Sequence, residues 1–478
     1  MASDWPALQA AIDGDVVLSS SPDYDSARKP AIARFYHVRP EAVARCRTPG
    51  DVTETISFAQ RTGRATATRS GGHCFAGRSS CEGIVIDVTP MNAVSVSGDI
   101  VTIGAGARLG DVYRSLNHHD LTLPAGSCPS VGIAGLTLGG GLGILGRKYG
   151  LTSDQLLRAQ VVLADGRITE CDSDHEEELF WALRGAGAGT FGVVTSFVFR
   201  TRPASPATNF QLVWPLASAA TVIDAWQAWA PAAPDELHAS LLATAQCDIE
   251  RPPVLTLFGS MLGKEQDAAV LIDQLVVRAG AEPTTEFLKH MSRQATTRYW
   301  ATLGVEPADR DEQQDASQLE YPLLKSEFFR QPLPREAITA LLANLEKGRT
   351  PDHSRELDFT PWGGAYNRVR EDATAFAHRQ ELFSLKHAAV IDSESAKSAG
   401  DAAQRWLTKS WQTVRPWGSG RVFPSFPDPD LEDWRQAYYG TNYERLLQAK
   451  EKYDPGNTFR FHQSVSSDVG RGRASGMK

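Results

Sequence analysis

Two short glycine-rich segments constrain this chain more than any other feature of its sequence. The first, Arg69–His73, reads RSGGH, and the second, Gly126–Gly141, holds six glycines and the dipeptide Cys128-Pro129. Adjacent glycines accept positive φ angles and expose backbone N–H groups, so such loops can bind a pyrophosphate or lie flat against a ring. A lone histidine or cysteine usually serves packing. The pairing of His73 with Cys128, 55 residues apart and each in its own glycine loop, favours a shared cofactor site instead.

Length, charge and cysteine content exclude several classes of protein. With 478 residues, 42% of them hydrophobic, the chain is long enough for about two to four domains. Its net charge of −8 and the lack of a long basic run argue against nucleic acid as a partner. No apolar run approaches the roughly 18 to 20 residues of a membrane span and the start is not signal-like, so we expect no membrane association and a cytoplasmic location. The six cysteines form no C-x-x-C pair, so no metal site is expected.

Hydrophobic periodicity and turn residues indicate an α+β chain whose composition and element lengths change after residue 206. The first part alternates short strands and helices, whereas the second is alanine-rich with longer helical runs. The expected elements are a helix over Val52–Thr62 with Asp51 as its N-cap, β-rich runs between residues 65 and 107, and helices over Leu109–His118, 217–230, 264–279, 334–347 and Leu431–Lys452.

Two matches to the dinucleotide-binding pattern G-x-G-x-x-G occur in unsuitable surroundings. The match at Gly187–Gly192 follows a helix-like stretch and precedes a strand-like one, which reverses the strand-to-helix turn that places a pyrophosphate at a helix N-terminus. The match at Gly141–Gly146 leaves little room for a helix before Gly150. We interpret both as packing turns. The main sequence evidence for an NAD-dependent dehydrogenase is thereby removed.

The two glycine loops and several later motifs resemble the berberine bridge enzyme-like branch of the vanillyl-alcohol-oxidase flavoprotein superfamily. Members of this branch carry R-S-G-G-H and C-P-x-x-G-x-x-G loops at about the spacing of His73 and Cys128. Further motifs that look like those of the family follow in the family's order: Glu178–Gly185, Gly189–Thr195, Gly363–Ala365, Thr374–Arg379, Tyr438–Asn442 and Tyr453–Phe459.

This resemblance implies an FAD cofactor held by two covalent bonds, from His73 to the flavin 8α-methyl carbon and from Cys128 to ring carbon C6. Attachment through His73 alone, with Cys128 as a packed thiol, is the alternative. Val131 matches a family position where a small β-branched side chain is associated with oxygen access, which implies an oxidase rather than a dehydrogenase. The other residues implied at the cofactor site are Arg69, Ser70, Gly71, Gly72, Gly132, Gly135, Gly140, Gly141, Gly192, Val194, Tyr439, Asn442 and Asn457.

The fold implied by the resemblance is a PCMH-type (vanillyl-alcohol-oxidase-like) FAD-binding domain of the α+β class. It would be built from residues 1–205 and 412–465, with a substrate domain at 206–411 that contains an antiparallel β-sheet backed by helices. Residues 466–478 are expected to form a disordered tail. The flavin is expected at the domain interface, where ligand sites are common. We expect a monomer or a homodimer.

The tyrosines that serve as the base in many relatives are absent from this chain. Those relatives carry a Y-x-N-Y segment before the C-terminal helix, and the corresponding positions here read as Phe423 and Phe426. The position two residues after the linked histidine, often a tyrosine, is Phe75. Because a benzene ring cannot accept a proton, the base has to come from elsewhere.

Four residues of the second domain are candidates for catalysis. Lys386 corresponds to a position where some relatives carry a catalytic Glu or Gln, and could bind an anionic substrate or act as a base. Glu356 and Asp358 share one face of a strand-like stretch by period-two alternation. Tyr366 follows the Gly-Gly-Ala motif. Solvated charges and aromatic packing are the ordinary alternatives for these residues.

The expected function is that of an FAD-dependent oxidase that acts on an alcohol, a hemiacetal or a C–H bond next to a heteroatom, with O2 reduced to H2O2. Phenylalanine at several expected pocket positions favours an aromatic or polycyclic natural product, because sugar recognition needs many oriented hydrogen bonds. A carbohydrate oxidase that forms a lactone is the alternative. A flavin-free binding protein on the same scaffold is a third, against which the intact His73 and Cys128 argue.

Overall fold

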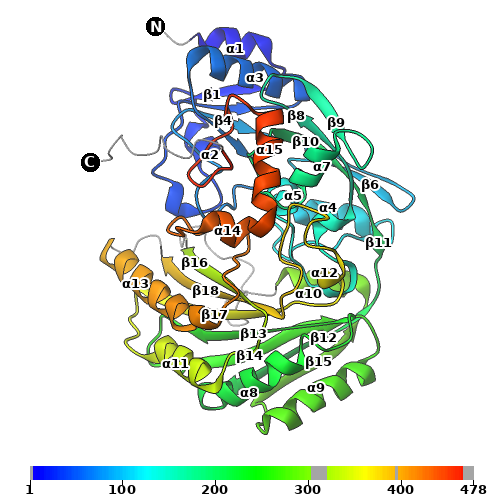
Figure 1. Ribbon diagram of the computed structural model, residues 1–478, viewed down its shortest axis with the longest axis vertical. Coiled ribbons are helices and arrows are strands. Elements are labelled where there is room, and N and C mark those ends of the chain that lie inside the picture. Colours follow the sequence, from blue (N-terminus) through cyan, green and yellow to red (C-terminus); the bar gives the residue numbers. More distant parts are fainter. Residues whose placement is uncertain (1–3, 303–319, 393–396, 467–478) are drawn as a thin grey trace.

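The computed structural model describes residues 4–302, 320–392 and 397–466, and these form two stacked lobes (Figure 1). The first 200 residues, drawn in blue to teal, build the upper lobe together with the C-terminal segment, drawn in red. The middle of the chain, drawn in green to orange, builds the lower lobe. Among the described residues no helix is long and apolar enough to cross a membrane.

The first sheet of the upper lobe has four short strands. Its order is β1 (Asp15–Leu18), β2 (Ala42–Arg45), β4 (Ile84–Asp87) and β3 (Thr66–Arg69), and the β2–β4 and β3–β4 pairs are parallel. Helix α3 (Pro49–Thr62) follows β2. Its N-cap is Thr48, whose side chain accepts the Asp51 N–H, and Asp51 reciprocally accepts the Thr48 N–H. The prediction of Asp51 as N-cap is therefore wrong, because Pro49 fits the first helical position and starts the helix earlier.

The second sheet of the upper lobe is antiparallel. Its order is β5 (Val94–Ser97), β6 (Ile100–Gly104), β10 (Val193–Arg200), β8 (Leu156–Val162) and β9 (Ile168–Cys171), and β7 (Leu121–Thr122) pairs separately with β11 (Arg202–Pro203). The helices are α1 (Trp5–Ala11), α2 (Tyr24–Arg28), α4 (Leu109–Asn117), α5 (Ile133–Leu138), α6 (Gly146–Tyr149) and α7 (Glu177–Leu183). The turn Gly187–Gly192 joins α7 to β10, which confirms the predicted helix-to-strand turn.

A seven-stranded antiparallel sheet forms the lower lobe. Its order is β15 (Thr285–Met291), β12 (Ala207–Pro215), β14 (Val254–Met261), β13 (Leu237–Ala245), β17 (His353–Pro361), β18 (Phe383–Asp392) and β16 (Glu320–Phe329). Helices α8 (Leu216–Trp229), α9 (Glu265–Ala279), α11 (Arg335–Glu346) and α13 (Lys397–Val414) cover the face turned away from the upper lobe (Figure 1). The predicted α+β class, with an antiparallel sheet backed by helices, is confirmed.

The sheet has one apolar face and one mixed face because its side chains alternate. In β17, Leu357 and Phe359 are buried in the core beneath the helices, whereas Glu356 and Asp358 are only partly buried on the opposite side. We call that opposite side the inner face, since it is turned toward the upper lobe. Helices α10 (Arg293–Ala301) and α12 (Ala365–Arg368) lie outside the helical layer.

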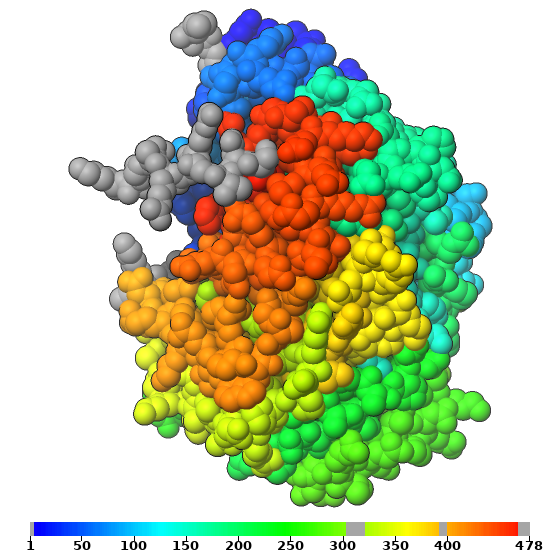
Figure 2. Space-filling model, viewed as in Figure 1, coloured from blue at the N-terminus to red at the C-terminus, as the bar shows by residue number. Residues whose placement is uncertain are grey.

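The C-terminal segment returns to the upper lobe and shares its core. Figure 2 shows it in red between the blue and teal parts of that lobe and directly above the orange and yellow parts of the lower one. The predicted single helix over Leu431–Lys452 is wrong, because α14 (Trp434–Tyr439) and α15 (Tyr443–Tyr453) are separated at Gly440. Gly440 has φ of 54°, which interrupts a right-handed helix. The predicted domain boundaries at residues 205 and 411 stay a proposal.

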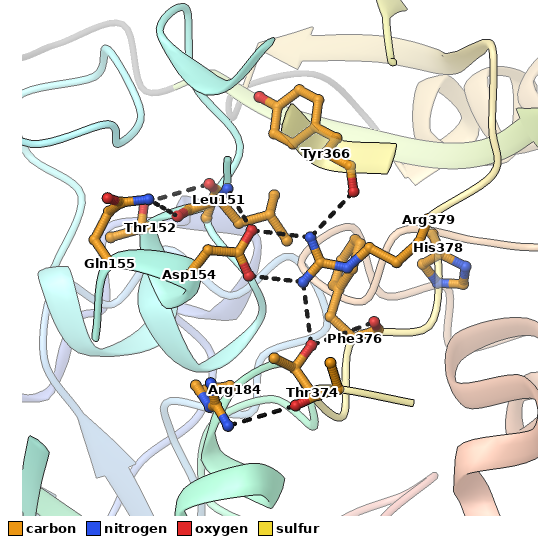
Figure 3. Close-up of polar contacts among 12 residues, drawn as sticks. Leu151, Thr152, Asp154, Gln155, Arg184, Tyr366, Thr374, Phe376, His378 and Arg379 are labelled. Atoms are coloured by element: carbon orange, nitrogen blue, oxygen red, sulfur yellow. Dashed lines mark hydrogen bonds and ion pairs between the residues drawn. The ribbon is translucent and has the colours of Figure 1, made fainter. Parts of the chain in front are cut away.

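Buried arginines fasten the inner parts of the two lobes together. The Arg379 guanidinium makes two bonds of 2.7 and 2.9 Å to the Asp154 carboxylate and a third to the Thr374 hydroxyl (Figure 3). Arg147, at the start of α6, donates to four backbone carbonyls of the middle segment, among them those of Leu237 and Ala233 at 3.0 and 2.6 Å. These contacts fix α6 and the adjoining turn Thr152–Gln155 of the upper lobe to the middle segment of the chain.

Candidate active site

The two glycine loops are in direct backbone contact. A Cβ atom added to Gly71 would lie 2.2 Å from the Gly132 nitrogen, and one added to Gly132 would lie 2.3 Å from the Gly71 nitrogen. Any side chain at either position would therefore force the loops apart. The Ser70 hydroxyl donates to the Ala105 carbonyl at 2.7 Å, which ties the first loop to the segment after β6. The fold thus joins two loops that the sequence separates by 55 residues.

His73 lies at this junction as a neutral imidazole. Burial lowers its pKa, and the positive charge of Arg108 lowers it further, against an opposing hydrogen bond with the Ser130 backbone. The His73 Nε2 atom is buried and has no hydrogen-bond partner among the residues that the structure describes. A buried nitrogen without a partner is costly unless another group occupies its lone pair. This is the state expected of a side chain that attaches to a cofactor.

Cys128 presents a thiol at the surface of the second loop. The residue is exposed, its sulfur is not in a disulfide, and its Sγ lies 3.3 Å from the Ser130 hydroxyl. Nothing outside its own helix lies within 4 Å of a Cβ atom built on the exposed Gly135, which is in α5 after the second loop. An accessible thiol followed by a helix with an open glycine face can accommodate a flat ring system. The residues at this junction therefore fit a flavin that is bound at both loops.

Other predicted cofactor residues donate hydrogen bonds to backbone carbonyls of neighbouring segments. The Arg69 guanidinium donates to three carbonyls, Tyr439 donates to one at 2.9 Å, and the Asn442 amide donates to two, at 2.7 and 3.1 Å. Asn457 has a positive φ of 49°, and its buried Oδ1 has no partner within the described part of the chain. Five further predicted cofactor residues are closely packed by neighbouring atoms: Gly72, Gly140, Gly141, Gly192 and Val194.

The inner face carries a charged triad, Glu356, Asp358 and Lys386, on the neighbouring strands β17 and β18. Lys386 in β18 is the cross-strand partner of Asp358 in β17, and the Nζ–Oδ2 distance between them is 2.9 Å. Glu356 points to the same side two residues earlier. Burial acts to lower the pKa of Lys386, but the two carboxylates outweigh it and raise that pKa. Lys386 is therefore held as an ammonium. This favours the two carboxylates over the Lys386 amine as the proton acceptor.

A run of aromatic rings connects this triad to the His73 loop. The Lys386 ammonium lies 5.8 Å from the centroid of Phe426, and the Phe426 ring lies 6.1 Å from that of Phe75. Phe75 is two residues after His73. The structure thus places three of the four predicted catalytic residues on one face of the sheet, with Phe426 and Phe75 between them and the loop that carries His73.

The loop that holds Phe426 is anchored from the lower lobe. The Phe423 N–H donates to the Ser326 hydroxyl at 3.4 Å, and the Lys325 ammonium forms a buried ion pair of 2.5 Å with Asp428. Both partners of that pair are about 5% exposed. The loop that in relatives is expected to supply a tyrosine base therefore contributes a fixed aromatic wall in this chain.

Tyr366 does not join the charged triad. Its hydroxyl donates to the Gly143 carbonyl at 3.0 Å, and its ring stacks on Trp362 at a centroid distance of 4.3 Å. The side chain is fully buried, and burial raises the pKa of its phenol. Figure 3 shows its backbone carbonyl directed at Arg379. The geometry gives Tyr366 a packing role in place of the predicted catalytic one.

Two polar residues near the site were missed by the sequence reasoning. His238 in β13 is buried on the inner face, its Nε2 lies 3.0 Å from the Ser240 hydroxyl, and its pKa is lowered to about 4, chiefly by burial. The available signal was the polar residues at alternate positions 238, 240 and 244 of that strand, interrupted only by Leu242. Ser130 contacts both anchor side chains, and only its place two residues after Cys128 marked it in the sequence.

Family models match the two segments of the chain that build the upper lobe, and known proteins are similar to the chain over nearly its whole length. A family model described as an FAD binding domain matches residues 40–172, and one described as berberine and berberine like matches residues 422–466. An uncharacterized FAD-linked oxidoreductase of Bacillus subtilis, YgaK, is 32% identical over 465 residues, which span 95% of this chain and 97% of that protein.

Proteins of a plant and a moss are also similar to this chain over most of its length. The berberine bridge enzyme-like protein D-1 of Nicotiana tabacum is 30% identical over 83% of this chain and 77% of its own length. The solved structure of BBE-like 1 from Physcomitrella patens has a TM-score of 0.86 at 27% identity, covering 96% of this chain and 98% of that one.

Proposed function

The chain belongs to the berberine bridge enzyme-like family and is an FAD-linked oxidoreductase, and from this premise we propose that His73 and Cys128 both bond to the flavin. The observation that carries the proposal is the backbone contact between Gly71 and Gly132, which places the two anchor loops side by side. The unpartnered Nε2 of His73 and the exposed Cys128 thiol support it. When bound, the flavin supplies an acceptor for hydride from the substrate and passes the electrons to O2, giving H2O2.

The charged triad of the inner face supplies the proton chemistry in this proposal. Asp358, with Glu356 beside it, accepts the proton of the substrate hydroxyl as the adjacent carbon loses hydride. Lys386 remains an ammonium and orients the substrate oxygen by donating a hydrogen bond. Removal of the proton in step with hydride loss leaves a carbonyl as the product. Val131 at the cofactor loop agrees with access for O2.

The proposed substrate is a small aromatic or polycyclic compound. Phe75 and Phe426 form an apolar wall between the triad and the anchor loop, and a planar ring can pack against it. A carbohydrate oxidase is a second candidate, since the charged side chains of the triad can also hydrogen-bond sugar hydroxyls. Both candidates use the same anchors and the same triad.

A peroxide assay on two substrate panels tests the proposed function. The purified holoenzyme is incubated in air with aromatic and polycyclic alcohols and, separately, with mono- and oligosaccharides, and H2O2 is measured. We expect turnover of an aromatic alcohol and loss of that turnover in Asp358→Asn. Turnover of oligosaccharides alone would favour the second candidate. Substrate-dependent bleaching of the flavin without H2O2 would refute the oxidase assignment.

A further inference from the structure

Ser130 is in contact with both anchor side chains through different atoms. Its hydroxyl lies 3.3 Å from the Cys128 sulfur, and its backbone hydrogen-bonds the His73 imidazole. That bond raises the pKa of His73, so the Ser130 carbonyl is the acceptor. The Ser130 carbonyl also lies 3.1 Å from the position of a Cβ atom on Gly71. One residue therefore spans the junction of the two loops.

The Cys128 thiol needs such a contact because little else restrains it. The residue is exposed, so its side chain can sample the three staggered χ1 rotamers. The turn that follows is fixed by a 3.3 Å bond from the Val131 N–H to the Cys128 carbonyl, which holds Ser130 close to the sulfur. A hydroxyl at 3.3 Å favours the rotamer that points toward it, and it can donate to the sulfur as the thiol loses its proton.

We propose that Ser130 is a positioning residue for covalent attachment of the flavin at Cys128, and that its side chain has no part in attachment at His73. This role rests on the proposed two-point linkage. Attachment at Cys128 forms a carbon–sulfur bond at a ring carbon. The thiol hydrogen and the displaced ring hydrogen, with two electrons, pass to O2 and leave as H2O2. The hydroxyl of Ser130 holds the sulfur in place during that step.

The two contacts of Ser130 can be separated by mutation, because alanine removes the hydroxyl and keeps the carbonyl. Loss of one weak hydrogen bond predicts roughly fivefold slower attachment at Cys128. Ser130→Ala leaves that carbonyl in place, so attachment at His73 is expected to proceed at an unchanged rate. Ser130→Thr keeps a hydroxyl and is expected to restore most of the rate.

The experiment measures each linkage alone in the full-length chain. Ser130→Ala is combined with His73→Ala, where only Cys128 can bond, and with Cys128→Ala, where only His73 can. Apoprotein is mixed with FAD in air, and the flavin retained after acid precipitation is followed with time, together with the intact mass. Ser127→Ala, on the other side of Cys128, is the matched control. Thermal unfolding of each apoprotein shows that the variants are folded.

We expect slower retention for Ser130→Ala in the His73→Ala background only, with rescue by Ser130→Thr. Equal slowing in both backgrounds would overturn the proposal, because it would indicate a general structural role. An unchanged rate in the His73→Ala background would overturn it as well. Failure of the His73→Ala chain to retain flavin while Ser130 is intact would instead overturn the Cys128 linkage itself, and the role of Ser130 with it.

Discussion

The buried pair between Arg379 and Asp154 allows a quantitative prediction about how the lobes are held together (Figure 3). Their side chains are 1% and 9% exposed, and the carboxylate accepts two guanidinium bonds and the Leu151 N–H at 2.9 Å. Asp154→Asn removes the negative charge and turns an amide N–H group toward the guanidinium. Each hydrogen bond to a charged group contributes about 1.5–3 kcal/mol, and an unpaired buried charge costs about 3–5 kcal/mol.

We therefore expect Asp154→Asn to lower the free energy of unfolding by about 3–5 kcal/mol. Urea titration followed by tryptophan fluorescence measures this change. Glu170→Gln, which breaks the exposed pair with Arg158, is the matched control and is expected to have a much smaller effect. Replacing Arg379 and Asp154 together by Met and Leu should recover much of the loss. A decrease in the free energy of unfolding below about 1 kcal/mol for Asp154→Asn would refute this reasoning, because it would show that Arg379 does not depend on Asp154 as its buried counter-charge.

Three further predictions follow from the site and its supports. Lys386→Met removes the ammonium that orients the substrate oxygen in the proposed reaction, so kcat/KM should fall by roughly tenfold, and an unchanged kcat/KM would exclude the ion pair with Asp358 from catalysis. Gly132→Ala should separate the anchor loops and reduce covalently retained flavin at least severalfold, whereas Gly50→Ala, with room for a methyl group, should not. Burial raises the pKa of Glu327 to about 7, above its unfolded value of about 4.5, so stability should fall as the pH rises between these values; Glu327→Gln should flatten that dependence in thermal melts.

The parts of the fold that depend on local pattern could be predicted from the sequence. Helices α8, α9 and α11 begin and end within a residue or two of the expected ranges, because their apolar periodicity and end signals are local. The alternation of Glu356 and Asp358 placed both carboxylates on one face of β17. The glycine loops were recognisable because their residue types and spacing are specific.

The parts that depend on distant contacts could not be predicted in this way. Tyr366 looked like a pocket residue, but its hydroxyl binds a carbonyl more than 200 residues away in sequence. The carbonyl partners of Arg147 come from a segment about 90 residues downstream or farther, and no sequence pattern pairs a guanidinium with carbonyls. The break at Gly440 was hidden because the flanking stretches share one helical pattern. Tertiary packing decided each of these positions.

The mass of the denatured protein tests the two-point attachment of the flavin most directly. Acid-denatured wild-type protein should stay yellow and be heavier than the bare chain by one FAD. His73→Ala and Cys128→Ala should each keep that added mass, and the double variant should release the flavin. Flavin freed from the wild-type chain by denaturation would contradict covalent attachment, and flavin freed from His73→Ala alone would contradict the bond at Cys128.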